Sequence, residues 1–235
     1  MKIDNWEKSP YNDSEIIKKH EKHTFAFLSS NPMIKTKFSQ LSHDAKLQYD
    51  ALSVTKKAKV HNIDFQSSFE VTCLNRDLRI HIGAIIKNDF SHVTYYLAVF
   101  SKNKRGKYII RRKFHFDYDK KDSLNVKPRF HMQYAGKLTS ALSGPEDYYD
   151  AMFFPELSEP RMYSTPMTLA ILLSKVFKEF QCVDTHKIVE DPNWKSILAE
   201  HEKIFLKPYF EWCGTFFKVH HKASRLFTTD FCYGK

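Results

Sequence analysis

Helical spacing of apolar residues marks the first quarter of the chain. Between residues 14 and 29 the apolar side chains share one helical face, and Asn31-Pro32 predicts the end of this helix. A second helix is predicted next, because apolar residues recur at steps of three and four before a lysine-rich run: Ile34, Phe38, Leu41, Ala45 and Leu52. The pattern therefore predicts a helical start over residues 1–59.

From residue 60 the period of the pattern changes to two, which is typical of strands with one buried face. Short polar turns separate the alternating runs, so consecutive strands are expected to pair as an antiparallel meander. The expected strands lie near residues 65–73, 78–84, 93–99, 108–118 and 129–135. The region 60–135 is therefore predicted to form an antiparallel sheet.

The last two expected strands each place ionisable residues on one face. Alternation predicts that these side chains point away from the core onto a wet surface: Arg111, Lys113, His115 and Asp117 in the first strand, and Arg129, His131 and Gln133 in the second. The simplest hairpin register sets Asp117 opposite Arg129 and His115 opposite His131. Four ionisable groups would then lie close together.

These groups are the ones that general acid–base cleavage of a phosphodiester uses. One imidazole accepts a proton, the other delivers one, and a guanidinium stabilises the charge on phosphate. The candidate catalytic residues are therefore His115, Asp117, His131 and Arg129. Arg111, Lys113 and Gln133, on the same face, are candidate contacts to nucleic acid, and this chemistry requires no metal and no cofactor.

Two other interpretations of this face remain open. Charged residues that alternate along a strand often form only a solvated surface, and Asp117 with Arg129 would then be an ordinary cross-strand ion pair. The two histidines with Asp117 would also suit zinc, although the sequence has no H-x-x-x-H or C-x-x-C spacing.

The segment 136–160 carries acidic and aromatic residues without helical or strand spacing. A loop of this length is usually functional, so it is predicted to act as a lid or a partner-binding segment. Thr165-Pro166 then predicts the start of a helix that runs through Phe180. Arg161 precedes this helix, where backbone N–H groups favour anions, and is therefore a further candidate contact to nucleic acid.

The end of the chain is predicted to be helical. Asp191-Pro192 has the form of a helix cap followed by a first-turn proline. Pro208 is expected to kink or interrupt this helix, because proline has no N–H to donate. The aromatic run 209–219 is then expected to continue as a further helix.

Charge narrows the class of partner. The chain has 37 Lys and Arg against 27 Asp and Glu, a formal net charge of +10 and a pI near 9.3. Such a domain attracts polyanions, so nucleic acid or an acidic protein is the expected partner. The phosphate-loop, dinucleotide, nucleophile-elbow and H-E-x-x-H motifs are absent, which argues against the enzyme classes that use them.

Cysteine use and hydropathy point to the cytoplasm. The 4 cysteines form no C-x-x-C pair, so they are expected to be free thiols in a reducing compartment. The N-terminus has no apolar signal segment, and no later run approaches the roughly 18 uncharged residues that cross a bilayer. A cytoplasmic protein with no membrane partner is therefore expected.

Four short motifs follow one another between about residues 107 and 180: His115-Phe116-Asp117-Tyr118, Pro128-Arg129-Phe130-His131, Pro160-Arg161 and the helix that begins at Pro166. In this order they resemble the TumE-like toxins of toxin–antitoxin pairs and uncharacterised bacterial proteins of phage-defence islands. The resemblance implies a bacterial protein that acts on RNA and is held by an antitoxin.

The expected fold is α+β, with about five antiparallel strands packed against N- and C-terminal helices in a single domain over residues 1–235. Its expected parts are the helical start 1–59, the sheet 60–135, the loop 136–160 and the helical end 161–235. The expected function is that of a nucleic-acid-acting protein of the toxin or phage-defence kind, working as a metal-independent ribonuclease. The alternative is a non-catalytic subunit of a defence complex that binds nucleic acid or a protein partner.

Overall fold

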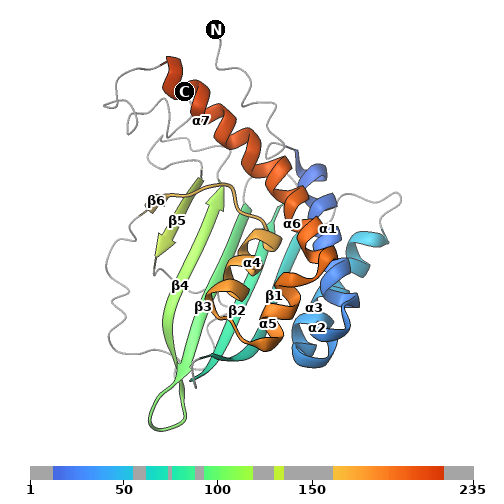
Figure 1. The fold of residues 1–235 in the computed structure, drawn as a ribbon, viewed down its shortest axis with the longest axis vertical. Coiled ribbons are helices and arrows are strands. Elements are labelled where there is room, and N and C mark those ends of the chain that lie inside the picture. Colours follow the sequence, from blue (N-terminus) through green and yellow to red (C-terminus); the bar gives the residue numbers. More distant parts are fainter. Residues whose placement is uncertain are drawn as a thin grey trace.

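A six-stranded antiparallel sheet forms the centre of the molecule (Figure 1). The computed structural model describes residues 13–54, 62–73, 76–87, 93–118, 130–134 and 161–219. The strands are β1 Ile63–Cys73, β2 Arg76–Ile86, β3 Val93–Lys102, β4 Tyr108–Tyr118, β5 Phe130–Tyr134 and β6 Arg161–Tyr163. Each strand pairs with the one before it in the chain, which confirms the predicted meander, and the short β6 is a strand that the sequence pattern did not indicate.

Helices from both ends of the chain pack together on one face of this sheet (Figure 1). The N-terminal ones are α1 Ser14–Ser30, α2 Pro32–Lys37 and α3 Ser39–Ser53. The C-terminal ones are α4 Leu169–Glu179, α5 Val183–Glu190, α6 Pro192–His201, a π-helical turn Glu202–Leu206 and α7 Lys207–Val219. The α+β class predicted from the sequence is therefore confirmed.

The core lies between the helices and the sheet face that they cover. Strand residues alternate into it, as the period of two predicted, except at a bulge in β4 near Arg111, beyond which Ile110 lies on the opposite face with Phe100. Large apolar side chains from strands and helices meet there: Phe65, Phe69, Ile82, Tyr95, Phe25, Leu28, Phe177 and Trp194. Segments from both ends of the sequence thus contribute to one layer of side chains.

Two helices begin or end at other residues than predicted. The second predicted helix is divided at Phe38, whose φ of −130° and ψ of 52° are not helical, although its side chain is buried. The helix predicted from Thr165-Pro166 begins instead at Leu169, because Thr168 is the residue that caps it. The Thr168 hydroxyl accepts a hydrogen bond from the N–H of Ile171, which satisfies one donor of the first turn.

The predicted disturbance near Pro208 takes the form of a widened helical turn. The Lys207 N–H donates to the carbonyl of Glu202, five residues earlier, which defines the π-helical turn. Pro208 then falls in the first turn of α7, where its missing N–H costs little. The predicted interruption at Pro208 does not occur, because the helix continues through this π-helical turn into α7.

Three further predictions from the sequence concern the segment 136–160, the cysteines and membrane-spanning helices. The segment 136–160 lies outside the residues that the structure describes. Cys73, Cys182 and Cys213 are free thiols. Within the described helices, none combines the length and the apolar character needed to cross a membrane.

Candidate functional site

The sheet face opposite the helices carries five of the polar residues singled out in the sequence: Lys113, His115 and Asp117 in β4, and His131 and Gln133 in β5. In the pairing of β4 with β5, Asp117 lies opposite His131 and His115 lies opposite Gln133. The predicted register, with His115 opposite His131, is wrong by two residues. An even shift keeps every side chain on its face, so the four residues still share one surface. Arg129, the remaining candidate catalytic residue, lies outside the described residues.

Asp117 and His131 form the centre of this site. Asp117 Oδ2 lies 3.6 Å from His131 Nε2, and the hydroxyl of Thr94 in β3 donates a 2.6 Å hydrogen bond to Asp117 Oδ1. Gln133 Nε2 lies 3.3 Å from His131 Nε2. Three adjacent strands therefore hold one carboxylate and one imidazole together, an arrangement in which the carboxylate orients the ring.

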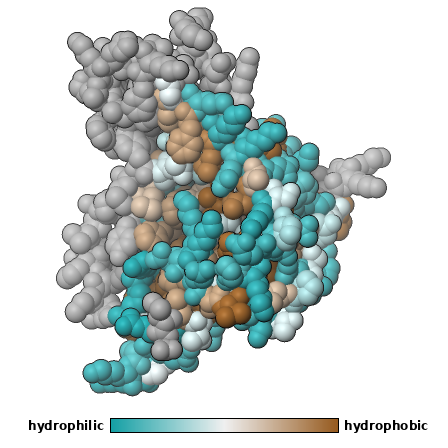
Figure 2. Space-filling model, viewed as in Figure 1, coloured by the Kyte–Doolittle hydropathy of each residue, from teal (hydrophilic) through white to brown (hydrophobic). Residues whose placement is uncertain are grey.

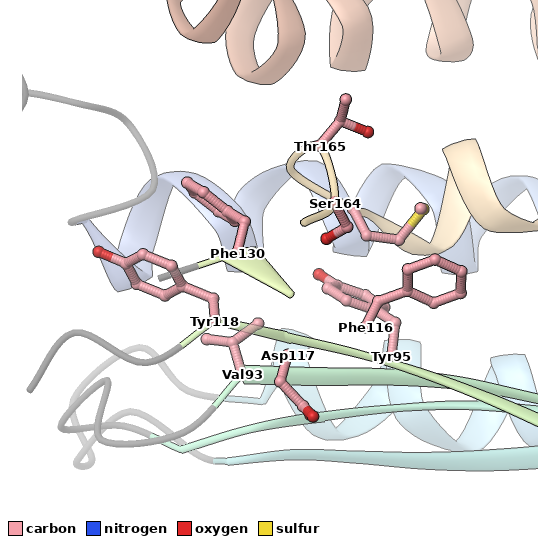
Figure 3. Close-up of a pocket in the computed structure, with 9 residues that line it drawn as sticks. Val93, Tyr95, Phe116, Asp117, Tyr118, Phe130, Ser164 and Thr165 are labelled. Atoms are coloured by element: carbon pink, nitrogen blue, oxygen red, sulfur yellow. The ribbon is translucent and has the colours of Figure 1, made fainter. Parts of the chain in front are cut away.

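Figure 3 shows how alternation separates Asp117 from its apolar neighbours. The Asp117 carboxylate points to the opposite side of the sheet from the rings of Phe116 and Tyr118. The ring of Phe130 in β5 lies on the same side as those two rings and stacks on Tyr118, with a centroid distance of 4.8 Å. The covered face is thus aromatic at this point, and the polar pair belongs to the other face.

The expectation of a wet surface is wrong for most of these residues. His131 is 0% exposed, Asp117 is 9% exposed and Lys113 is 1% exposed. His115 and Gln133 are half-buried, and Arg111 alone among the described candidates on β4 and β5 is exposed. Alternation determines which face a side chain takes, but the depth of burial depends on what packs over that face.

Aromatic residues on the same face explain part of this burial. Tyr96 lies opposite His115 in the register of β3 and β4, and their ring centroids are 6.2 Å apart. Further along, Ala98, Phe100 and Ile110 form a small second apolar cluster. The face is therefore a mixture of polar and aromatic side chains, and the interpretation of it as a simple solvated surface fits only its exposed positions.

The predicted phosphate clamp at the start of α4 is not formed as expected. Arg161 lies in β6 opposite Gln133, and α4 begins eight residues later, at Leu169. The N–H of Leu169 donates a 2.9 Å hydrogen bond to Oε1 of Glu21, which also accepts a 2.7 Å bond from Tyr95. The chain's own carboxylate thus occupies this helix end. Contact between Arg161 and nucleic acid stays a prediction.

Glu21 is an ionisable side chain that lies within the apolar core. It is 0% exposed. Burial raises the pKa of its carboxyl to about 7, although the hydrogen bonds from Leu169 and Tyr95 act in the opposite direction. The carboxyl joins α1, the centre of the sheet and the start of α4, and its role is structural.

His81 of β2 is a further histidine of the sheet, and it lies apart from the Asp117 group. The strand β3 separates β2 from β4, and the His81 ring packs against Phe100 with a centroid distance of 4.6 Å. Burial is the larger and the positive charge of Arg79 the smaller of two effects that lower the pKa of His81 to about 4. A neutral, packed histidine in this position does not belong to the Asp117 group.

The turn at 102–106 between β3 and β4 is rich in basic residues and is not among the site residues predicted from the sequence. In the structure this turn and the strand beyond it present exposed cations: Lys102, Lys104, Arg105, Lys107, Arg111 and Arg112. We call residues 102–112 the basic hairpin. The Asn103 side chain accepts hydrogen bonds from the N–H groups of Arg105 and Lys107, and Gly106 has a φ of 76°, so the turn has a defined conformation.

A cleft of about 590 Å³ opens on the helical side, between α4 and the strands β3 to β5. Its floor is apolar, with Leu97, Phe114 and Met132 from the strands. Its rim is charged, and Arg112 Nη1 lies 3.3 Å from Glu179 Oε1. Figure 2 shows apolar and hydrophilic side chains next to one another in the middle of this view.

Comparisons with protein-family models, with curated proteins and with solved structures found no match.

Proposed function

We propose that this chain binds nucleic acid, and that the basic hairpin 102–112 is its main contact with the phosphate backbone. Six of these eleven residues are Lys or Arg, and none is acidic. All six are exposed. This local concentration of exposed cations is the observation that carries the proposal, because phosphate neutralisation releases counterions whatever the base sequence.

The packing of the hairpin supports this role. The Arg79 guanidinium lies over the Tyr108 ring at 4.1 Å from its centroid, and Lys102 Nζ lies 5.4 Å from the same centroid. The Tyr108 hydroxyl donates a 2.9 Å hydrogen bond to Glu70. The base of the hairpin is therefore anchored on β1 and β2, so cations beyond it are presented from a supported turn.

A second candidate function, cleavage of RNA, is favoured by the Asp117–His131 pair. A carboxylate 3.6 Å from an imidazole can orient that ring as a general base. His115, two residues before Asp117 on the same face of β4, would be the second proton-transfer group. In this proposal the chain is a metal-independent ribonuclease of the toxin or phage-defence kind in a bacterial cytoplasm. An antitoxin or a defence-complex subunit would then be its protein partner.

Binding of a labelled single-stranded RNA and a DNA duplex, followed by fluorescence anisotropy at increasing salt, tests the first proposal. The variant Lys104→Ala/Arg105→Ala should bind about tenfold more weakly, with a log–log salt slope smaller by roughly 1.5. The control Lys35→Ala/Lys187→Ala removes two exposed lysines from α2 and α5 and should bind like the unmodified protein. Equal losses in both variants, or no binding at low salt, would contradict the proposal.

A further inference from the structure

Two histidines of α1 and one glutamate of α6 meet where these helices lie side by side (Figure 1). His20 and His23 are three residues apart on α1, so their side chains lie on the same helical face. Glu200 comes from the last turn of α6. These three residues lie far from the Asp117 group in the sequence and on the helical side of the sheet.

The ligand atoms of the three side chains converge. His20 Nδ1 lies 3.5 Å from Glu200 Oε1, and His23 Nδ1 lies 3.8 Å from Glu200 Oε2. The three groups offer ligand atoms that all lie within 4.8 Å of one another. Two donors that each lie about 2.0–2.1 Å from a tetrahedral zinc ion are roughly 3.3 Å apart, so a small closure would bring these atoms into coordination distance.

A second observation independently indicates a ligand. The His20 side chain is only 5% exposed, and within the described part of the chain its Nδ1 makes no hydrogen bond, although Glu200 lies nearby. Buried polar atoms without a hydrogen bond are rare, because on burial such an atom loses its hydrogen bonds to water and gains none in return. The buried nitrogen faces the same space as the two more exposed groups, and a coordinated ion would satisfy it.

The helices around this point are held in place by a buried polar network. His201 Nδ1 lies 2.8 Å from the Thr168 hydroxyl, and His201 Nε2 lies 3.3 Å from both the Thr24 hydroxyl and the carbonyl oxygen of His20. Phe205 packs edge-on against the His20 ring at 5.7 Å. These contacts fix the end of α6 against α1 and so set the position of Glu200.

We propose that His20, His23 and Glu200 form a binding site for a first-row divalent transition-metal ion, and zinc matches this ligand set. Two imidazole nitrogens and one carboxylate oxygen suit zinc and its neighbours and are a poor set for calcium or magnesium, which take oxygen ligands. The His23 and Glu200 side chains are 47% and 44% exposed, so an ion can enter from solvent. Three protein ligands leave a coordination position for water or a further ligand.

The test uses the full chain without an affinity tag, freed of metal by a chelator and then titrated with Zn²⁺ against a chromophoric competitor. One ion per chain should bind and raise the melting temperature. His23→Ala and Glu200→Gln change partly exposed side chains, so they should fold normally and bind Zn²⁺ roughly tenfold or more weakly. In addition, Co²⁺ should show d–d absorption in the unmodified protein that Glu200→Gln loses.

Two controls match these variants. His43→Ala removes an exposed histidine from α3, and Glu202→Gln removes an exposed carboxylate close to Glu200, and both should bind Zn²⁺ like the unmodified protein. A third variant, His220→Ala/His221→Ala, tests the histidine pair near the C-terminus. The proposal is overturned if the unmodified chain binds no stoichiometric Zn²⁺, if His23→Ala and Glu200→Gln bind normally, or if only the His220/His221 change abolishes binding.

Discussion

Gly83 of β2 and Tyr96 of β3 lie opposite each other in the sheet, and the Tyr96 ring occupies the space that a side chain at position 83 would fill. A Cβ there would overlap the phenol ring and come 2.5 Å from the carbonyl oxygen of Phe65. Glycine within a strand usually weakens it, and an aromatic ring laid over the glycine compensates by covering the bare backbone.

Gly83→Ala should therefore lower the free energy of unfolding by about 3 kcal/mol, because the ring and the strand must both shift. Urea denaturation followed by circular dichroism measures this. Adding Tyr96→Ala should relieve only part of the overlap, since the Phe65 carbonyl remains.

The matched control is Tyr96→Phe. The Tyr96 hydroxyl is buried without a hydrogen-bond partner among the described residues, so its loss should leave stability equal or higher. A Gly83→Ala protein as stable as the unmodified one would contradict this packing.

Tyr95→Phe should lower the free energy of unfolding by about 1–3 kcal/mol. The Tyr95 hydroxyl donates a 2.7 Å hydrogen bond to the buried carboxyl of Glu21, and its removal leaves that carboxyl, among the described residues, with the bond from the Leu169 N–H. The same denaturation measurement applies. Tyr49→Phe, which changes a partly exposed tyrosine of α3, serves as the control and should have little effect. If both variants lose stability equally, the Glu21 contact is not the cause.

His81 should make the protein less stable as the pH falls below neutral. Its pKa is lowered from 6.5 to about 4 in the folded chain, so between these values the unfolded chain binds a proton that the folded chain does not. The free energy of unfolding is therefore unaffected by this proton above pH 6.5. It falls by about 2 kcal/mol as the pH is lowered from 6.5 toward 4, after allowance for the partial exposure of His81. Free energies of unfolding across this range should fall less steeply in His81→Phe. Identical pH profiles would show that His81 does not titrate in this way.

The candidate catalytic pair is best tested with Asp117→Asn, which keeps the shape of the side chain. If the chain cleaves RNA, this variant and His115→Ala should each lose roughly 100-fold or more of the activity, and the double variant should lose little more. His131→Ala also empties a fully buried position, so it should cost stability as well as activity. Circular dichroism must therefore accompany each assay. Full cleavage by Asp117→Asn would leave nucleic-acid binding as the function.

Strand positions and faces could be predicted because alternation is a local property. Strand residues take their face from their place in the alternation, so Phe65 and Phe130 point to the core and Asp117 and His131 point away. The bulge in β4 breaks this rule at Ile110, which packs with Phe100 on the opposite face. Helix boundaries were less predictable. Thr165 and Thr168 offer similar caps, and the structure selects Thr168, where the Leu169 N–H meets the Glu21 carboxylate.

The candidate site was predictable as a set of residues on one face, but its pairings were not. The connection between β4 and β5 is long and does not fix their register. A shift of two residues keeps every side chain on its face, so the hydrophobic pattern cannot distinguish the two registers. The structure places His131, and not Arg129, opposite Asp117. It also buries His131 and Lys113, which alternation alone assigned to a wet surface.

The sequence by itself determined the α+β class, the order of the strands and the concentration of positive charge at residues 102–112, because each follows from the spacing or type of neighbouring residues. Only the tertiary structure decided which distant side chains meet. Glu21 reaches Leu169, and His20 and His23 reach Glu200, across most of the length of the chain. Such contacts depend on how α1 packs against α4 and α6, and packing is set by the fit of whole faces and not by any local pattern.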